Sequence, residues 1–144
     1  MPILDLLRPS TKRASGSHQE HLGCHGLVRF PTADEAATLY AKALDAGRRA
    51  IGEDRFETMA GHFWGDLSTR PYMRARAFLA ETLVSLERLD DAMAHYGAML
   101  ELNPNDNQGN RYPLLALLLE CERHEAAEAL VAQYANDAGA EWAY

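Results

Sequence analysis

Apolar residues recur at steps of three and four along most of the chain from residue 32 onward, the spacing that places them on one face of an α-helix. The clearest example runs from Arg70 to Leu102, where two such runs are separated by the turn Glu87-Arg88-Leu89-Asp90. The next segment, Asn103 to Asn107, is rich in turn-forming residues and ends the second run. The pattern therefore predicts an antiparallel hairpin of two helices.

Two more helices are predicted before this hairpin. Thr32-Ala-Asp-Glu35 has the capping-box spacing, so a helix is expected to begin at Thr32, and Gly52 is expected to end it. A second helix is predicted by apolar residues at helical spacing, three of them aromatic, which we expect to face the core: Phe56, Met59, Ala60, Phe63, Trp64 and Leu67. Residues 32–67 are thus expected to form a first hairpin.

A third hairpin is predicted after the central one, with helices over Gln108–Glu120 and His124–Tyr134. Ala126 lies 34 residues beyond Ala92, which predicts equivalent positions in a repeat. The side chains expected to cap the later helices are Ser68 or Thr69, Asp90, and Asp106 or Asn107. The fold class that follows is all-α.

The two ends of the chain differ from this pattern. Residues 1–31 hold several Pro, Gly, Ser and Thr residues without a sustained period, so we expect a flexible N-terminal arm followed by one helical domain over 32–144. Glu141 to Tyr144 resembles the first turn of a further helix, and no polar capping element follows it. We therefore expect either a truncated domain or a C-terminal face that is covered by another chain, including a second copy.

Composition narrows the function classes. The formal net charge is −7, and residues 26–144 hold nineteen acidic and eleven basic side chains, which argues against a nucleic-acid binder. The longest apolar run, Pro113 to Leu119, is too short to cross a membrane. The two cysteines do not suggest a disulfide framework. These features predict a soluble, cytoplasmic protein.

One cluster of potential metal ligands lies in the N-terminal arm: His18, His21, Cys24 and His25. A zinc site normally adds a second ligand pair from another element, and His62, His95 and Cys121 do not have that spacing. A polar, histidine-rich loop is the simpler interpretation, so no cofactor is expected. A metal-dependent or enzymatic protein that uses this cluster remains the alternative hypothesis.

The central hairpin resembles a tetratricopeptide repeat. Its matching frame is Arg76-x2-Leu79-Ala80-x2-Leu83, then Ala92-x3-Tyr96, then Pro104. Ala80 and Ala92 would allow the two helices to approach closely, while Leu79, Leu83 and Tyr96 fill the space around them. The resemblance implies hairpins stacked as a short right-handed superhelix.

A more specific resemblance rests on the strings TRPYMRAR (69–76) and LNPNDNQGNRY (102–112), followed by a helical hairpin and W-A-Y. These are similar to bacterial tetratricopeptide-like proteins and to a region of the suppressor-of-tumorigenicity tetratricopeptide family. The resemblance covers roughly residues 35–144 and implies an α-helical scaffold without an established reaction. It also implies that the helical array continues beyond the W-x-Y motif.

The function expected from these features is a noncatalytic scaffold that binds a protein or peptide segment in a groove of the helical repeat. The expected contact residues are polar and aromatic groups near the starts of the first helices of adjacent hairpins: Arg70, Tyr72, Arg74, Asn107, Gln108, Arg111 and Tyr112. A structural subunit that docks through its C-terminal end is a second alternative.

The arginines near the start of the central hairpin have a competing interpretation. Arg70, Arg74 and Arg76 lie close to a helix N-terminus, where the helix dipole disfavours positive charge. We expect them to form ion pairs with acidic residues of the first hairpin, namely Glu53, Asp54, Glu57 or Asp66.

Overall fold

The computed structural model describes residues 30–136, and this part of the chain is all-helical, without strands. Its elements are α2 (Ala33–Ile51), α3 (Glu53–Thr58), the 3-10 turn η1 (Phe63–Gly65), α4 (Arg70–Ser85), α5 (Leu89–Leu102), α6 (Arg111–Glu120) and α7 (His124–Gln133). The predicted all-α class is confirmed for these residues. The expectations for the N-terminal arm and for residues 137–144 lie outside them.

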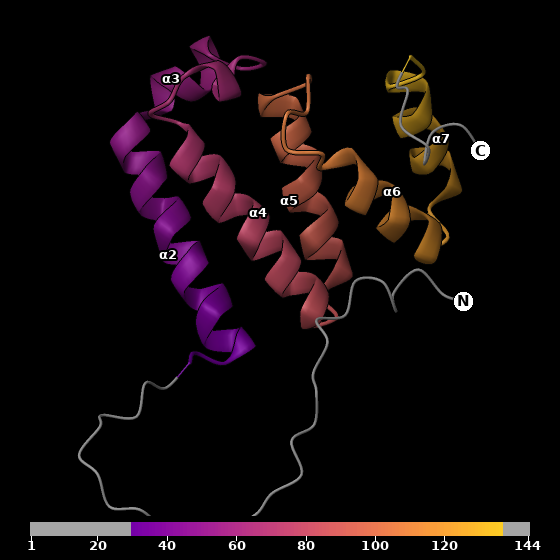
Figure 1. The fold of residues 1–144 in the computed structure, drawn as a ribbon, viewed down its shortest axis with the longest axis horizontal. Helices are drawn as coiled ribbons and strands as arrows, with labels where there is room; N and C mark the ends of the chain where they lie inside the picture. Colours follow the sequence, from indigo (N-terminus) through magenta and orange to yellow (C-terminus); the bar gives the residue numbers. More distant parts are fainter. Residues whose placement is uncertain (1–29, 137–144) are drawn as a thin grey trace, which may run out of the picture.

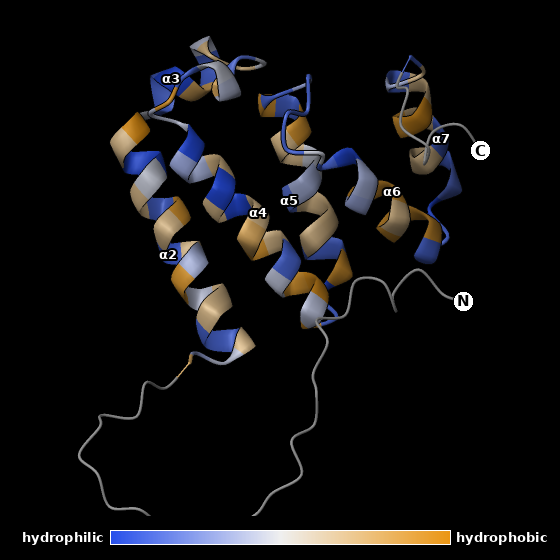
Figure 2. Cartoon of the chain, in the orientation of Figure 1, coloured by the Kyte–Doolittle hydropathy of each residue, from blue (hydrophilic) through white to orange (hydrophobic). Residues whose placement is uncertain are grey.

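The long helices stand side by side in chain order, each antiparallel to the next (Figure 1). Contacts follow the same order, since α2 packs on α4, α4 on α5, α5 on α6, and α6 on α7. The short α3 and the turn after it lie across the end of the α2–α4 pair. Figure 2 shows apolar residues on each of the long helices. The domain is thus a row of helices that pack on their neighbours in sequence.

The first helix begins and ends as predicted. The Thr32 hydroxyl accepts from the Glu35 N–H at 3.3 Å, and the Glu35 carboxylate accepts from the Thr32 N–H at 2.8 Å, which completes the capping box. Gly52 ends the helix with φ of +88°, a backbone conformation that glycine adopts without a steric penalty.

The predicted second helix is wrong, because α3 ends at Thr58 and the chain turns before α4. Gly61 takes φ of +83° in this turn. The turn brings Phe63 into the core, where its ring is fully buried, while Leu67 is left 72% exposed. In a continuous helix, Phe63 and Leu67 would lie on the same face, because they are four positions apart, and one could not be buried while the other is exposed. Burial of Phe63 therefore outweighs continuation of the helix.

The break changes the partner of α2. Instead of pairing with a second helix of its own hairpin, α2 packs directly on α4. At the close approach, a Cβ atom on Gly47 would lie 3.1 Å from the Tyr72 ring. The Tyr72 ring also lies 5.1 Å from the Phe56 ring, centroid to centroid. The glycine therefore makes room for a buried tyrosine that joins α2, α3 and α4.

Two of the predicted caps are wrong. The Thr69 side chain makes no cap hydrogen bond to α4; its hydroxyl donates to the carbonyl oxygens of Phe63 and of Asp66. The helix α5 begins at Leu89, before Asp90, and has no side-chain cap. Thr69 is fully buried, so satisfying its hydroxyl locally avoids the cost of an unpaired polar group.

The packing predicted for the central hairpin is confirmed. Ala80 and Ala92 are fully buried. The larger residues around them are almost fully buried: Leu79, Leu83 and Tyr96. Burial raises the pKa of the Tyr96 phenol to about 12. Small residues at the contact allow α4 and α5 to pack closely.

The turn geometry of the central hairpin recurs after 35 residues, one more than the predicted spacing of 34. Glu87 and Glu122 both adopt positive φ, +59° and +55°, in the turns of the two hairpins. In each turn the next residue closes the same hydrogen bond: Arg88 N–H donates to the Leu83 carbonyl at 2.9 Å, and Arg123 N–H donates to the Leu118 carbonyl at 2.7 Å. The buried equivalent of Ala92 is consequently Ala127, whereas Ala126 is exposed.

Candidate partner-binding site

The loop between α5 and α6 is organised by a buried carboxylate. The Asp106 side chain has no exposed surface. Its Oδ1 accepts from the Asn110 N–H at 2.7 Å, and its Oδ2 accepts from the Arg111 N–H at 3.0 Å. The N-cap residue of α6 is Asn110, which has no side-chain cap hydrogen bond, so the prediction of Asp106 or Asn107 as the cap is wrong. Asp106 instead binds these N–H groups from the preceding loop, and its negative charge lies at the favourable end of the helix dipole.

The same carboxylate fixes the Arg111 side chain. Arg111 Nη1 donates to Asp106 Oδ2 at 2.9 Å, and Nη2 donates to the Tyr112 hydroxyl at 2.8 Å. The guanidinium carbon lies 4.4 Å from the Tyr112 ring centroid and 5.3 Å from that of Tyr134. Hydrogen bonds and two aromatic rings therefore hold this cation in one orientation.

Tyr134, at the end of α7, ties the last helix to the loop. Its hydroxyl donates to the Pro104 carbonyl at 2.9 Å. Burial, reinforced by the charge of Asp106, raises the pKa of the Tyr134 phenol, although Arg111 opposes this shift. The phenol consequently keeps its proton at neutral pH and remains a hydrogen-bond donor.

A hollow of about 350 Å³ lies beside Arg111. Its described lining comes from the α5–α6 loop, the start of α6 and the end of α7: Pro104, Asn105, Arg111, Gln133, Tyr134 and Asn136. We call this the α6–α7 hollow. Three of its residues carry carboxamides, which both donate and accept hydrogen bonds, the combination that a peptide main chain requires.

Three buried polar atoms of the loop have no protein hydrogen-bond partner among residues 30–136: Asn103 Nδ2, Gln108 Oε1 and Asn110 Nδ2. Asn103 and Asn110 are only 3% and 4% exposed. Leaving such groups unpaired costs stability.

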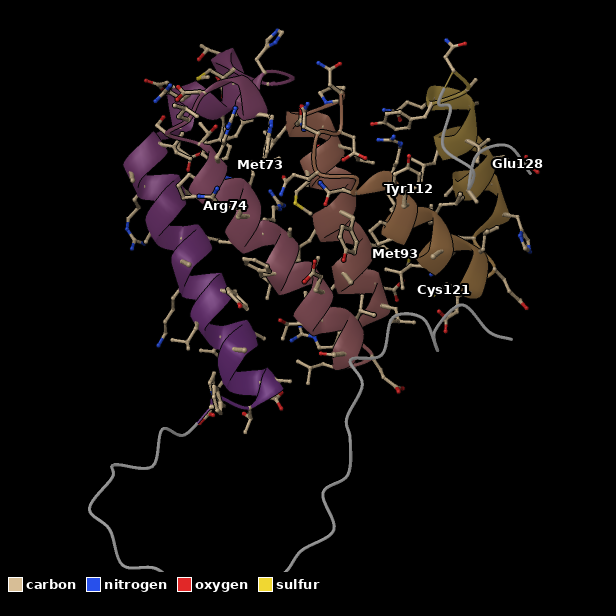
Figure 3. All side chains as sticks on the ribbon, in the orientation of Figure 1. Met73, Arg74, Met93, Tyr112, Cys121 and Glu128 are labelled. Carbon is tan, nitrogen blue, oxygen red and sulfur yellow. The ribbon has the colours of Figure 1, made fainter. Side chains whose placement is uncertain are left out.

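The structure separates the predicted contact residues into two groups. Arg111 lines the hollow, and the Tyr112 ring stacks against the Arg111 guanidinium. In the adjoining loop, Asn107 is exposed and Gln108 is half-buried. Arg74 projects from α4, on the other side of α5 from Tyr112 (Figure 3). Arg74 is exposed and makes no ion pair within the described part of the chain.

Two other predicted contacts have internal roles. Tyr72 is 6% exposed, so its ring belongs to the core and offers no surface to a partner; this prediction is corrected. Arg70 donates through Nε to the Trp64 carbonyl at 3.0 Å, and its guanidinium carbon lies 5.0 Å from the Trp64 ring centroid. Arg70 thus fastens α4 to the turn that follows α3.

The ion pairs predicted for the α4 arginines are wrong for the residues that the structure describes. Asp66 pairs with Arg55, and Glu53 pairs with Arg48. Arg76 instead crosses to α5, where its Nε donates to His95 Nδ1 at 3.3 Å, and its Nη1 donates to the Tyr72 hydroxyl at 3.0 Å. These two acids therefore pair with arginines of α2 and α3 rather than with those of α4.

The Arg76–His95 contact predicts a pH dependence. Burial, together with the charge of Arg76, lowers the pKa of His95 below its usual value. The unfolded chain therefore binds a proton at a higher pH than the folded chain, so stability should be greatest above about pH 6.5 and fall as the pH drops below it. Urea unfolding at pH 7.5 and 5.5 measures this loss.

The matched variant for that experiment is His95→Gln, which keeps a hydrogen-bonding side chain but does not titrate. It should reduce the difference in urea midpoint between the two pH values. An equal difference in wild type and variant would show that His95 is not the group responsible.

Several residues of the hollow were not predicted from the sequence. Pro104 and Asn105 belong to a string that was interpreted only as a turn. Gln133, Tyr134 and Asn136 come from the end of α7, which returns to the start of α6 because the two helices are antiparallel. That antiparallel return is the signal that could have brought them into the predicted site.

Other sites are not seen in the described residues. Within 30–136, no three His, Cys, Asp or Glu side chains converge in a way that could hold a metal ion. The cluster His18, His21, Cys24 and His25 lies outside the described residues. None of the helices in that range is both long and apolar enough to span a membrane.

Comparison of the chain with models of known protein families, with curated proteins and with solved structures found no match. The resemblance to tetratricopeptide proteins therefore stays a prediction from sequence motifs.

Proposed function

We propose that this chain is a noncatalytic, cytoplasmic interaction scaffold, in which hairpins stacked as a short tetratricopeptide-like superhelix bind an extended segment of another protein. Two features support the architecture: the hairpin turn recurs after 35 residues with the same backbone geometry, and each helix packs on its neighbours in sequence. Arrays of this kind use the surface of several helices to bind protein segments.

The observation that carries the proposed binding site is the composition of the α6–α7 hollow. Asn105, Gln133 and Asn136 line it with carboxamides. Arg111 adds a guanidinium that is already oriented by Asp106, so binding costs little side-chain entropy. Because Asp106 balances the charge of Arg111, the hollow suits the neutral C=O and N–H groups of a peptide main chain better than an acidic tail.

Arg111 is a poor residue for testing this proposal, because its loss would also leave Asp106 without its partner. Gln133 is exposed and therefore better suited. A photo-crosslinking residue at position 133 should give a discrete adduct with a partner protein in cells. The same residue at position 85, where Ser85 is exposed at the far end of α4, is the matched control.

The double variant Asn105→Ala, Gln133→Ala provides a second readout. It should weaken binding of the crosslinked partner about tenfold, since two hydrogen-bonding groups are removed, while leaving the far-UV circular dichroism unchanged. Equal adducts from positions 133 and 85, or unchanged binding by the double variant, would show that the hollow is not the site.

A further inference from the structure

The chain leaves helix α7 at the rim of the α6–α7 hollow. The helix ends at Gln133, and Tyr134 is held to the α5–α6 loop by its hydrogen bond to the Pro104 carbonyl. Asn136, two residues further on, is the last described residue and also lines the hollow. The segment that follows it in sequence, residues 137–144, therefore begins beside the hollow.

The first four residues of this segment are small or acidic: Asp137, Ala138, Gly139 and Ala140. Three of them carry only a hydrogen or a methyl group as side chain, so no bulky group would keep their main chain away from the hollow. Their N–H and C=O groups are the partners that the carboxamides of the hollow require. The segment thus has the chemistry that the hollow suits.

The charges of the hollow and of the segment are compatible. Arg111 is the one charged side chain in the described lining, which contains no carboxylate, and the Asp106 carboxylate behind it is neutralised by Arg111. Among residues 137–140 the one charged side chain is that of Asp137, next to the rim residue Asn136. A carboxylate at this place meets no like charge in the described lining, so electrostatics does not oppose entry of the segment.

The connection to Asn136 gives this segment an advantage over a segment of another protein. Four extended residues span about 13 Å. This is more than the width of a compact space of about 350 Å³. A segment tethered so closely has an effective concentration on the order of millimolar. Even a weak interaction, with a dissociation constant of about 0.3 mM, would then favour the occupied hollow by about three to one.

We propose that residues 137–140 occupy the α6–α7 hollow of their own chain, and that a partner segment binds by displacing them. The displacement rests on the proposed function, whereas the occupancy itself needs no partner. An internal competitor of this kind lowers the apparent affinity for the partner by the fraction of chains in which the hollow is open. The segment would therefore set a threshold for partner binding.

Hydrogen exchange of the full chain, followed by NMR, tests the occupancy without a partner. The Gly139 amide should exchange about fourfold more slowly than in a peptide of the same sequence, as a three-to-one occupancy requires. The protection should not change over a roughly tenfold dilution, because the segment and the hollow belong to one chain.

The variant for this experiment is Ala138→Pro, Ala140→Pro, which removes two N–H donors of the segment but keeps that of Gly139. It should abolish the protection of the Gly139 amide. Ala143→Pro makes the same kind of change outside residues 137–140 and is the matched control, which should exchange as wild type does at Gly139.

The displacement is tested with the partner that is crosslinked from position 133. The proline pair Ala138→Pro, Ala140→Pro should bind it about fourfold more tightly than wild type, since every hollow is then open. In this background Asn105→Ala, Gln133→Ala should show its full loss of partner affinity, because those carboxamides no longer hold a competitor as well.

Three results would overturn the proposal. One is a Gly139 amide that exchanges as fast as in the peptide. The second is protection that persists in the proline pair or fades on dilution, since a different local structure or a second copy would then protect this amide. The third is equal partner affinity in wild type and the proline pair. Protection of Gly139 as expected, without a partner for any variant, would instead support the occupancy and contradict the proposed function alone.

Discussion

Replacing Asp106 by alanine is expected to destabilise the domain by about 3 kcal/mol, since removing one partner of a buried ion pair leaves the other without compensation. The Asp106 side chain is fully buried and that of Arg111 is 15% exposed. The variant also loses the two hydrogen bonds that the Asp106 carboxylate accepts from the N–H groups of Asn110 and Arg111 at the start of α6. For a domain of this size the thermal midpoint should fall by roughly 12–20 °C, measured by circular dichroism.

The control for this prediction is Asp91→Ala. Asp91 also pairs with an arginine, Arg88, but both side chains are more than half exposed. Exposed pairs contribute little, so this variant should lose less than about 1 kcal/mol. Similar losses in the two aspartate variants would mean that the Asp106–Arg111 pair does not organise the loop.

Local signals in the sequence were sufficient wherever one short segment determines the outcome. The capping box at Thr32 and the glycine at Gly52 set both ends of α2. The cap predicted at Asp106 or Asn107 was misplaced, since the N-cap of α6 is Asn110, but Asp106 does bind backbone N–H groups only four and five positions away. Such contacts depend on residue type and spacing rather than on the rest of the fold.

The segment after α3 was predicted incorrectly because its aromatic residues imitate a helix. Positions 56, 59, 60, 63, 64 and 67 have helical spacing. The feature that ends the helix is Gly61 at positive φ, but a glycine within an apolar period is also compatible with a helix. Tertiary packing of Phe63 against Phe56 decides between the two, and a single sequence does not show it.

The candidate site was predicted in part because its parts come from two ends of a hairpin. Arg111 and Tyr112 stood out as polar and aromatic groups near a helix start. Tyr72 has the same character, but it lies opposite Gly47, which leaves space for it in the core. An error of one residue in the repeat length rotates a helix by about 100°, so Ala126 was assigned to the core instead of Ala127.

Phe63→Ala is the variant that best tests the corrected fold. Phe63 is fully buried, with ring centroids 4.8 Å from Phe56 and 6.3 Å from Tyr72. Removing the ring leaves a cavity where α3, η1 and α4 meet, and we expect a loss of about 3–4 kcal/mol in the free energy of unfolding. Urea denaturation of the full chain measures it.

Leu67→Ala is the matched control, because the two possible paths of this segment give it opposite outcomes. In the structure Leu67 is 72% exposed, so its truncation should cost less than about 0.5 kcal/mol. In a continuous helix over residues 56–67, Leu67 would share the core face with Phe63 and its truncation would cost about 2 kcal/mol or more. A large loss in Leu67→Ala would therefore restore the continuous helix, whereas a large loss confined to Phe63→Ala supports the turn at Gly61 and the direct packing of α2 on α4.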